Sequence, residues 1–251
     1  MLTRDDLLAA LAQIRVMAPV RAQEVTGSTS TAAQAMAADG APEWTLVSAG
    51  HQTAGRGRSG RSWEDVEGHA LLFSFVLRPA LAPNRLGLLS LLAGAAMAGA
   101  IRDVSGRRVT CKWPNDLLLH GAKVGGILAE AKVRRDRVEY AVIGVGVNLD
   151  PPAVENAAGI GDASLRDLLA AFLRRFEEVY SAGEPSWEER VKGAWLPLSA
   201  TIGELVEATT TRGDVVKGRA VGIDDFGGLR LSTDEGEARV AFGDVTHLGT
   251  R

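Results

Sequence analysis

The sequence predicts an α+β fold, in which a large first domain over residues 1–198 is followed by a small β-barrel over residues 199–251. Two observations predict this division. Segments with helical periodicity alternate with short apolar runs typical of strands as far as Pro197. Beyond Pro197 the pattern changes to short β-like runs separated by Gly and Asp. Five such runs lie around Val206, Val215, Leu229, Val240 and Val245.

Four segments of the first domain have the periodicity and the end signals of helices. A Thr3-x-x-Asp6 cap precedes the first, Gly40 closes the second, and Ser164 caps the last. The last segment is clearly amphipathic, and the third is apolar enough to be buried. The expected helices cover residues 7–14, 28–38, 85–102 and 165–180.

Apolar runs between these helices predict the strands of a sheet. They cover residues 21–25, 44–49, 70–77, 117–132 and 138–147. A turn at Gly121 makes the fourth run a β-hairpin. A polar loop, residues 51–63, separates the second strand from the third.

The composition is that of a globular protein. Of 251 residues, 46% are hydrophobic and 24% are charged, which argues against wholesale disorder. The net charge of −3 argues against a polycation that binds nucleic acid along its whole length.

Several features bear on cellular location and on metals. The longest apolar stretch, residues 86–101, is interrupted by Ser90 and shorter than the ~20 residues that cross a membrane. Asp5 and Asp6 stand where a signal peptide is basic, so none is expected. The single cysteine, Cys111, excludes an intramolecular disulfide and fits a cytoplasmic protein. The four histidines lack metal-ligand spacing, so no zinc site is expected.

The most unusual segment is Gly55-Arg56-Gly57-Arg58-Ser59-Gly60-Arg61-Ser62-Trp63. Glycine lets the backbone approach a ligand, and arginine presents a planar fork to phosphate or carboxylate oxygens. The segment matches GxGxxG, but no helix follows it, and the preceding Gly50-x-x-x-x-Gly55 lacks the Lys-Ser/Thr of a P-loop. A flexible solvated loop, or a basic patch that contacts RNA, is the alternative interpretation.

Two further segments contain candidate ligand-binding groups. In Lys112-Trp113-Pro114-Asn115-Asp116 the extended Trp113 can wall a pocket while Asn115 and Asp116 present polar groups. The alternative is an ordinary turn between two strands. Lys123 stands beside a Gly-Gly strand and can reach a ligand across bare backbone, or is simply solvated.

Two more segments allow both a ligand-binding and a purely structural interpretation. Ser28-Thr29-Ser30-Thr31 offers helix N-terminal N–H groups to a ligand, or caps its helix through a Thr31-x-x-Gln34 box. Gly144-Val145-Gly146-Val147-Asn148 turns Asn148 toward a site, or is a packed core strand.

Taken together and in this order, the segments resemble the biotin–protein ligase family. Its hallmarks are a GRGRxxRxW loop and a KWPND segment followed by a Lys-x-x-Gly-Ile-Leu-x-Glu strand, and the resemblance is dense from Val25 to Asn148. It implies a class II synthetase-like core, a mixed β-sheet flanked by helices, with a small SH3-like C-terminal domain. It also implies an enzyme that uses ATP and Mg²⁺ to convert biotin to biotinyl-5′-AMP. The biotin then passes to a lysine of a biotin carboxyl carrier protein of acetyl-CoA carboxylase or a related carboxylase.

The resemblance also implies the site residues. Lys123 and Arg58 are the implied catalytic residues, and Mg²⁺ is expected to come with ATP, near Asp116, rather than in a protein cage. The residues implied around biotin and its activated carboxylate are Ser28, Thr29, Ser30, Gln52, Arg56, Gly57, Arg58 and Lys123. Those implied near ATP are Arg61, Trp63, Asn115, Asp116 and Asn148.

Two positions depart from the family pattern. Gly27 stands where an acid commonly precedes the Ser-Thr pair. The segment Gly243-Asp244-Val245 resembles the family's closing motif, but the arginine that often follows is missing, and Arg251 is the nearest candidate. No nucleotide contact is therefore assigned in the C-terminal domain.

Three other functions remain as alternatives. A lipoate ligase or octanoyltransferase shares the fold class, although the GRGR and KWPND pair favours biotin. A transcriptional repressor needs an N-terminal helix-turn-helix domain, and the segment before Ser28 is too short for one, so we expect a monofunctional ligase. A non-enzymatic nucleic-acid-binding module is the third, because of the arginine loop.

We expect no DNA or membrane partner, a monomer or weak homodimer, and Cys111 in the core rather than as a nucleophile.

Overall fold

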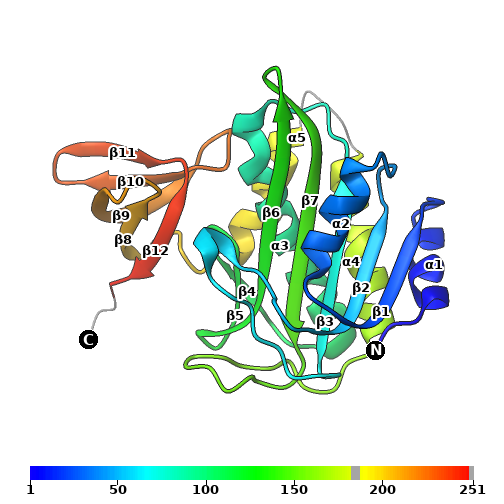
Figure 1. The fold of residues 1–251 in the computed structure, drawn as a ribbon. Helices are drawn as coiled ribbons and strands as arrows, with labels where there is room; N and C mark the ends of the chain where they lie inside the picture. Colours follow the sequence, from blue (N-terminus) through cyan, green and yellow to red (C-terminus); the bar gives the residue numbers. More distant parts are fainter. Residues whose placement is uncertain (182–186, 249–251) are drawn as a thin grey trace.

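The structure is a computed structural model that describes residues 1–181 and 187–248. Its larger part is built on a seven-stranded sheet with the strand order β1-β2-β3-β7-β6-β5-β4 (Figure 1). β1 is parallel to β2, and every other pair of neighbours is antiparallel, so the sheet is mixed, as the resemblance implies. The strands are β1 (Val20–Thr26), β2 (Leu46–Gln52), β3 (Ala70–Leu77), β4 (Thr110–Lys112), β5 (Asp116–Leu119), β6 (Ala122–Arg134) and β7 (Arg137–Asn148).

Helices cover both faces of this sheet. α2 (Thr29–Ala38) lies on the front face in Figure 1, whereas α3 (Leu86–Ser105), α4 (Leu165–Tyr180) and α5 (Trp187–Trp195) lie behind it. α1 (Arg4–Gln13) lies beside β1 and packs on α4. Its N-terminus has the predicted capping box, because Thr3 and Asp6 bond reciprocally. The predicted fold class is therefore confirmed.

The alternation of side chains along β3 separates the main core from the functional face. Phe73 and Phe75 point backward, and their rings contact Phe172 and Phe176 of α4 at centroid distances of 5.1 to 5.8 Å. Ser74, between them, points to the face that α2 covers. A single strand thus supplies the aromatic core on one side and a buried hydroxyl on the other.

The structure differs from the predicted elements in several places. Gln52 is the last residue of β2 rather than part of the following loop. α3 continues to Ser105, beyond the predicted end, and with the preceding turn it is long and apolar enough to cross a membrane by length and composition. However, 78% of its most apolar window is buried inside the protein. α5 was not predicted, although its buried residues Trp187, Val191 and Trp195 have helical spacing.

The five C-terminal runs form a separate antiparallel sheet with the order β11-β10-β9-β8-β12. Its strands are β8 (Leu205–Thr210), β9 (Val215–Ile223), β10 (Leu229–Thr233), β11 (Gly236–Val240) and β12 (Gly243–His247). This arrangement is consistent with the SH3-like domain that the resemblance implies. The sheet lies to one side of the main body, next to the β6–β5–β4 edge of the large sheet (Figure 1). The domain division between residues 198 and 199 stays a prediction.

Candidate functional site

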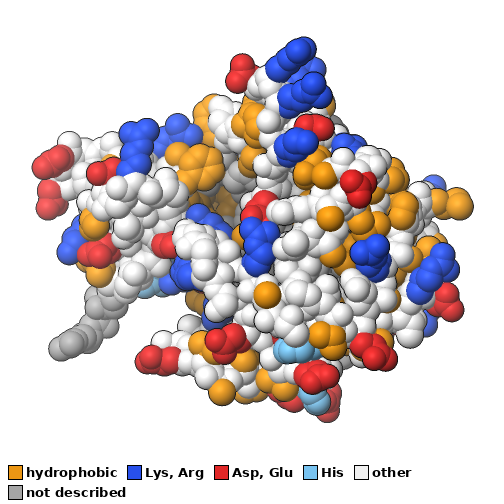
Figure 2. Space-filling model, in the orientation of Figure 1, with side chains coloured by type: hydrophobic (Ala, Val, Ile, Leu, Met, Phe, Trp, Pro, Cys, Tyr) orange, Lys and Arg blue, Asp and Glu red, His pale blue; other side chains and the backbone are white. Residues whose placement is uncertain are grey.

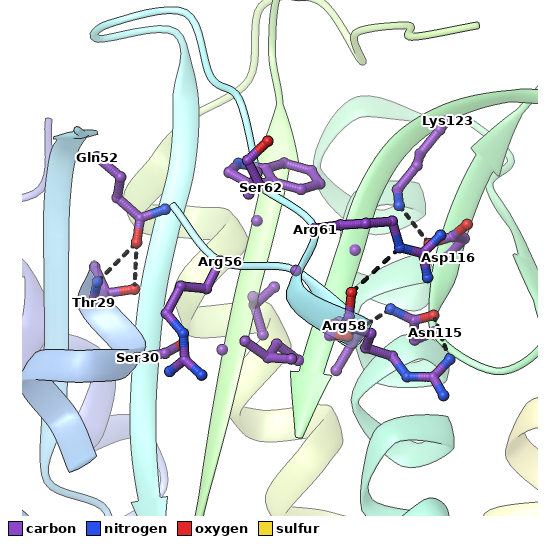
Figure 3. A pocket seen from close by; sticks show the side chains of 18 residues that line it. Thr29, Ser30, Gln52, Arg56, Arg58, Arg61, Ser62, Asn115, Asp116 and Lys123 are labelled. Carbon is purple, nitrogen blue, oxygen red and sulfur yellow. Dashed lines mark hydrogen bonds and ion pairs between the residues drawn. The ribbon is translucent and has the colours of Figure 1, made fainter. Parts of the chain in front are cut away.

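A pocket opens on the face of β6 and β7 that also carries α2 and the arginine-rich loop (Figure 3). It is lined by every predicted site residue except Ser28 and Asn148. Residues far apart in the sequence meet here because β2, β3, β7, β6 and β5 are consecutive neighbours in the sheet. The lining residues with polar side chains are Thr29, Ser30, Gln52, Arg56, Arg58, Arg61, Ser62, Trp63, Asn115, Asp116 and Lys123.

The floor of the pocket is made of glycines. Gly126 and Gly146 are paired across β6 and β7, and the indole of Trp63 lies on them. A Cβ atom at position 146 would stand 2.7 Å from Trp63 Cε2, and one at position 144 would overlap the Ser30 hydroxyl. The Gly-x-Gly spacing in β7 therefore lets side chains and ligands approach the bare backbone.

One end of the pocket is a neutral network of hydroxyl and amide groups. Gln52 Oε1 accepts hydrogen bonds from Thr29 N at 2.8 Å and from Thr29 Oγ1 at 3.1 Å. Ser74 Oγ lies 2.8 Å from Thr29 Oγ1 and 3.0 Å from Ser30 Oγ. Ser74 was not predicted as a site residue, although it is the one polar residue in the apolar strand Ala70–Leu77 and that signal could have identified it.

Ser28 has a supporting position just outside the pocket. It is the N-cap of α2, and its side chain accepts a 3.4 Å hydrogen bond from Thr31 N. The alternative capping box of Thr31 and Gln34 is wrong, because Gln34 Nε2 donates to Glu130 Oε2 at 2.7 Å instead.

The pocket also carries four cations that are paired with carboxylates. Arg56 lies beside Ser30, and the other three lie at the opposite end (Figure 3). Arg56 makes a bidentate pair with Glu130, with distances of 2.9 and 2.5 Å. Lys123 Nζ lies 2.6 Å from Asp116 Oδ1. Arg58 and Arg61 share Asp244, at 3.2 and 2.8 Å. The sequence analysis missed Glu130 and Asp244 as partners, because only the folded chain brings them to the loop.

Lys123 faces the pocket because of a β-bulge. Gly125 pairs with Leu117 and Lys123 with Leu118, so Val124 is the extra residue. Strict alternation would put Lys123 on the same side as Ile127, which packs in the main core. The bulge instead turns Lys123 to the side of Gly126, and its ammonium also lies 5.9 Å from the centroid of the Trp63 ring.

The arginine-rich loop has internal hydrogen bonds and a short 3₁₀ turn at Arg58–Gly60. Gly57 N donates to Arg61 O at 2.7 Å, and Trp63 N donates to Gly55 O at 2.9 Å. A buried carboxylate, Asp65, holds the base of the loop through His51 Nδ1 at 2.8 Å. The loop therefore has the geometry of a folded-back hairpin, closed by the Arg56–Ser62 bridge.

Trp113 does not line this pocket, but it lines a separate hollow together with Arg58, Pro114 and Gly227. Its ring N–H donates to Gly227 O at 2.9 Å and its backbone N–H to Thr201 Oγ1 at 3.0 Å, so it anchors the C-terminal domain. The following Trp113-Pro114 peptide bond is cis. Two residues later the segment enters the pocket, where Asn115 Nδ2 donates to Ile127 O at 2.8 Å. The turn between β4 and β5 therefore serves both the domain junction and the site.

A second hollow adjoins the pocket and is lined by Arg61, Trp63, Lys123, Asn148 and residues 152–157. Two polar atoms here are buried without a hydrogen-bond partner, the donor Trp63 Nε1 and the acceptor Asn148 Oδ1. An unpaired buried polar group is costly unless a ligand or water satisfies it.

Two residues named by the sequence analysis lie elsewhere. Cys111 is buried in the core, and burial raises the pKa of its thiol to about 12, so the thiol is protonated at neutral pH and inert. Arg251 lies outside the described residues. Within those residues no group of three or more His, Cys, Asp and Glu side chains could hold a metal ion.

Comparisons with known proteins agree with both parts of the fold. The model of the biotin/lipoate A/B protein ligase family matches residues 22–148, and that of the biotin protein ligase C terminal domain matches residues 201–248. The biotin–[acetyl-CoA-carboxylase] ligase of Mycobacterium tuberculosis is 34% identical over 258 residues, covering 98% of this chain and 94% of the relative. The bifunctional ligase/repressor BirA of Bacillus subtilis is also 34% identical and covers 88% and 72%.

Solved structures extend this likeness to three dimensions. The biotin protein ligase from Aquifex aeolicus in complex with biotin and ATP superposes with a TM-score of 0.70 at 23% identity, covering 91% of this chain and 97% of that one. An apo structure of the Aquifex aeolicus protein gives 0.73 at 21% identity, covering 92% and 100%. The fold is thus shared over nearly the whole length of these proteins.

Proposed function

Because the chain belongs to the biotin/lipoate A/B protein ligase family, we propose that its pocket activates biotin with ATP and passes it to a lysine of a carboxylase carrier domain. The enzyme is an AMP-forming ligase that uses biotin and ATP. One observation carries the assignment of the pocket, which joins a neutral hydrogen-bonding end to an end with three cations, Lys123, Arg58 and Arg61.

The neutral end is the proposed site of the biotin ring system. A ureido group is uncharged and offers one strong acceptor and two donors, so hydroxyl and amide groups suit it better than ions. Thr29, Ser30 and Gln52 supply such groups, and Ser74 orients two of them. Their mutual hydrogen bonds hold the polar atoms in place before biotin binds, which lowers the entropy lost on binding.

The charged end is the proposed site of adenylation. Attack of the biotin carboxylate on the α-phosphate of ATP brings two anions together, and that approach is strongly disfavoured without compensation. Lys123, with Arg58 and Arg61, supplies fixed positive charge that stabilises the developing charge. Pyrophosphate leaves, and biotinyl-5′-AMP remains as a mixed anhydride.

The neighbouring hollow is the proposed site of the adenine. The N–H of Trp63 Nε1 and the carbonyl oxygen of Asn148 are a donor and an acceptor without partners. The Watson–Crick edge of adenine offers the complementary ring-nitrogen acceptor and exocyclic amino donor. Trp63 and Asn148 both line this hollow beside Lys123, which supports their assignment to nucleotide binding.

Mg²⁺ fits this pocket as an ion that arrives with ATP. Magnesium is commonly held by substrate phosphates with one or two carboxylates rather than by an all-protein cage. Asp116 supplies one carboxylate, held beside Lys123. Bound there, the ion would neutralise phosphate charge, while Asp116 and Lys123 orient the triphosphate.

The arginine-rich loop is proposed to retain the adenylate. Water would hydrolyse the mixed anhydride, so a site that excludes water protects it until the acceptor lysine arrives. The ion pair of Arg56 with Glu130 and the internal hydrogen bonds of the loop hold it across the pocket. The lysine amine then attacks the acyl carbon and AMP leaves. The cytoplasmic location, the absence of DNA and membrane partners, and a monomer or weak homodimer stay predictions.

A direct test uses the purified protein with ATP, Mg²⁺, biotin and a biotin carboxyl carrier domain. We expect biotin-dependent release of pyrophosphate and labelling of the carrier lysine. Lipoate in place of biotin, and a carrier whose lysine is replaced by arginine, are the controls. If a folded preparation gives neither pyrophosphate nor label with biotin, the assignment fails.

A further inference from the structure

A carboxylate of the C-terminal domain lies on the loop of the catalytic domain. Asp244, in β12, accepts from Arg58 Nη1 through Oδ1 at 3.2 Å and from Arg61 Nη2 through Oδ2 at 2.8 Å. Arg58 Nη1 also donates to the backbone oxygen of Gly243 at 3.1 Å. One carboxylate therefore connects two guanidinium groups, with one oxygen for each.

In this contact one negative charge is shared by two positive charges, whereas the other ion pairs of the pocket match one charge with one. Arg56 has Glu130 and Lys123 has Asp116, whereas Arg58 and Arg61 share one negative charge. The Arg58 side chain is only 20% exposed, and burial lowers the pKa of its guanidinium. A partly buried cation beside a second cation needs an anion close by. Figure 2 shows acidic and basic side chains next to one another along the boundary between the two parts of the molecule.

A phosphate group satisfies the same arginines in the same way. Carboxylate and phosphate oxygens both accept from guanidinium N–H groups, and a pair of parallel bonds is the strongest form of each. A donor that already bonds Asp244 is not free for a phosphate. The phosphates of ATP carry more charge than one carboxylate and can displace it.

We propose that the Asp244 carboxylate pairs with Arg58 and Arg61 before nucleotide binds, and that the phosphates of ATP replace it. Replacement frees the carboxylate and removes this contact between the C-terminal domain and the loop. Asp244 is thus a positioning residue that acts through the two arginines and sets the affinity for ATP. This inference rests on the proposed function, since it takes ATP as the ligand.

The test compares Asp244→Asn with the wild-type full-length chain. Asparagine keeps the shape but removes the charge, so the arginines are left with a weaker competitor. Because an exposed ion pair contributes on the order of 1 kcal/mol, we expect the KM for ATP to fall about fivefold, with the KM for biotin unchanged. The Kd of a non-cleavable ATP analogue should fall by the same factor. Asp244→Glu, which keeps the charge, should behave like wild type.

Asp234→Asn is the matched control, because it removes the same charge from an exposed turn of the same domain. A KM for ATP that rises in Asp244→Asn and is restored in Asp244→Glu would overturn the proposal, since Asp244 would then align the arginines rather than compete for them. A change no larger than that of Asp234→Asn would also overturn it. Biotin-dependent pyrophosphate release by the wild type tests the proposed function separately.

Discussion

The two ends of the pocket are built in opposite ways. At the neutral end, Thr29, Ser30, Gln52 and Ser74 are connected by short hydrogen bonds, and Thr29, Ser30 and Ser74 are buried. At the charged end, Lys123 and Arg61 are about half exposed, and each is paired with a carboxylate. The neutral end is ready for its ligand, whereas the charged end must exchange internal partners for the ligand's oxygens.

This difference indicates where specificity and rate arise. A fixed hydrogen-bonding network selects a ligand by geometry, and its loss mainly weakens binding. Charges that contact the reacting groups stabilise the transition state or hold the adenylate, so their loss slows the chemistry or releases the intermediate. Substitutions at the two ends should therefore separate effects on rate from effects on biotin affinity.

The largest effect is expected at the charged end, for Lys123→Ala. Loss of one well-placed charge typically slows the chemical step by about a hundredfold or more. Single-turnover formation of biotinyl-AMP measures this rate directly. Arg135→Ala, at the exposed tip of the β6–β7 hairpin, is the control and should leave the rate unchanged. Equal rates for the two variants would remove Lys123 from the mechanism.

A smaller effect of a different kind is expected for Arg58→Gly. The variant should still make biotinyl-AMP but release it about tenfold faster, the equivalent of one lost charge-assisted hydrogen bond. Released adenylate acylates exposed lysines, so bystander serum albumin should become biotinylated. A streptavidin blot and adenylate dissociation rates measure both effects. Loss of adenylate synthesis without bystander labelling would assign Arg58 to the chemical step instead.

The smallest effect is expected at the neutral end, for Ser74→Ala. Removal of one neutral hydrogen-bonding group costs about 1 kcal/mol, which weakens biotin binding about fivefold and leaves the KM for ATP unchanged. Ser48→Ala is a matched control, because Ser48 is equally buried on the neighbouring strand and bonds only Leu72 O. Calorimetry measures the biotin affinity of the two variants. Equal weakening by both variants would mean that sheet stability, not the network, controls affinity.

The sequence predicted most of the pocket because its residues occur in short motifs with strong local signals. Glycines among arginines, a lysine beside a Gly-Gly pair and a Ser/Thr helix start are visible without the fold. The apolar run Ala70–Leu77 also predicted β3, although the meaning of its serine was missed. Fold class, family and activity are confirmed, while the ligand contacts of individual residues stay predictions.

What the sequence did not predict depends on contacts between distant segments. Asp244 is 186 positions from Arg58, and no local pattern connects them. The bulge at Val124 depends on the register between β5 and β6, so the direction of Lys123 could not be read from alternation. The contacts of Trp113 were not predicted for the same reason, because its partners Thr201 and Gly227 belong to the other domain.

The position of Trp113 has a consequence for how this chain can evolve. Trp113 is held by a hydrogen bond to the C-terminal domain. Asn115 and Asp116 follow within three residues on the same tight turn. A mutation that repacks the junction around Thr201 or Gly227 therefore shifts the polar groups at the pocket. Selection on catalysis then constrains residues that touch no substrate. The C-terminal domain cannot be exchanged for an unrelated one, or drift freely, without compensating change in the turn.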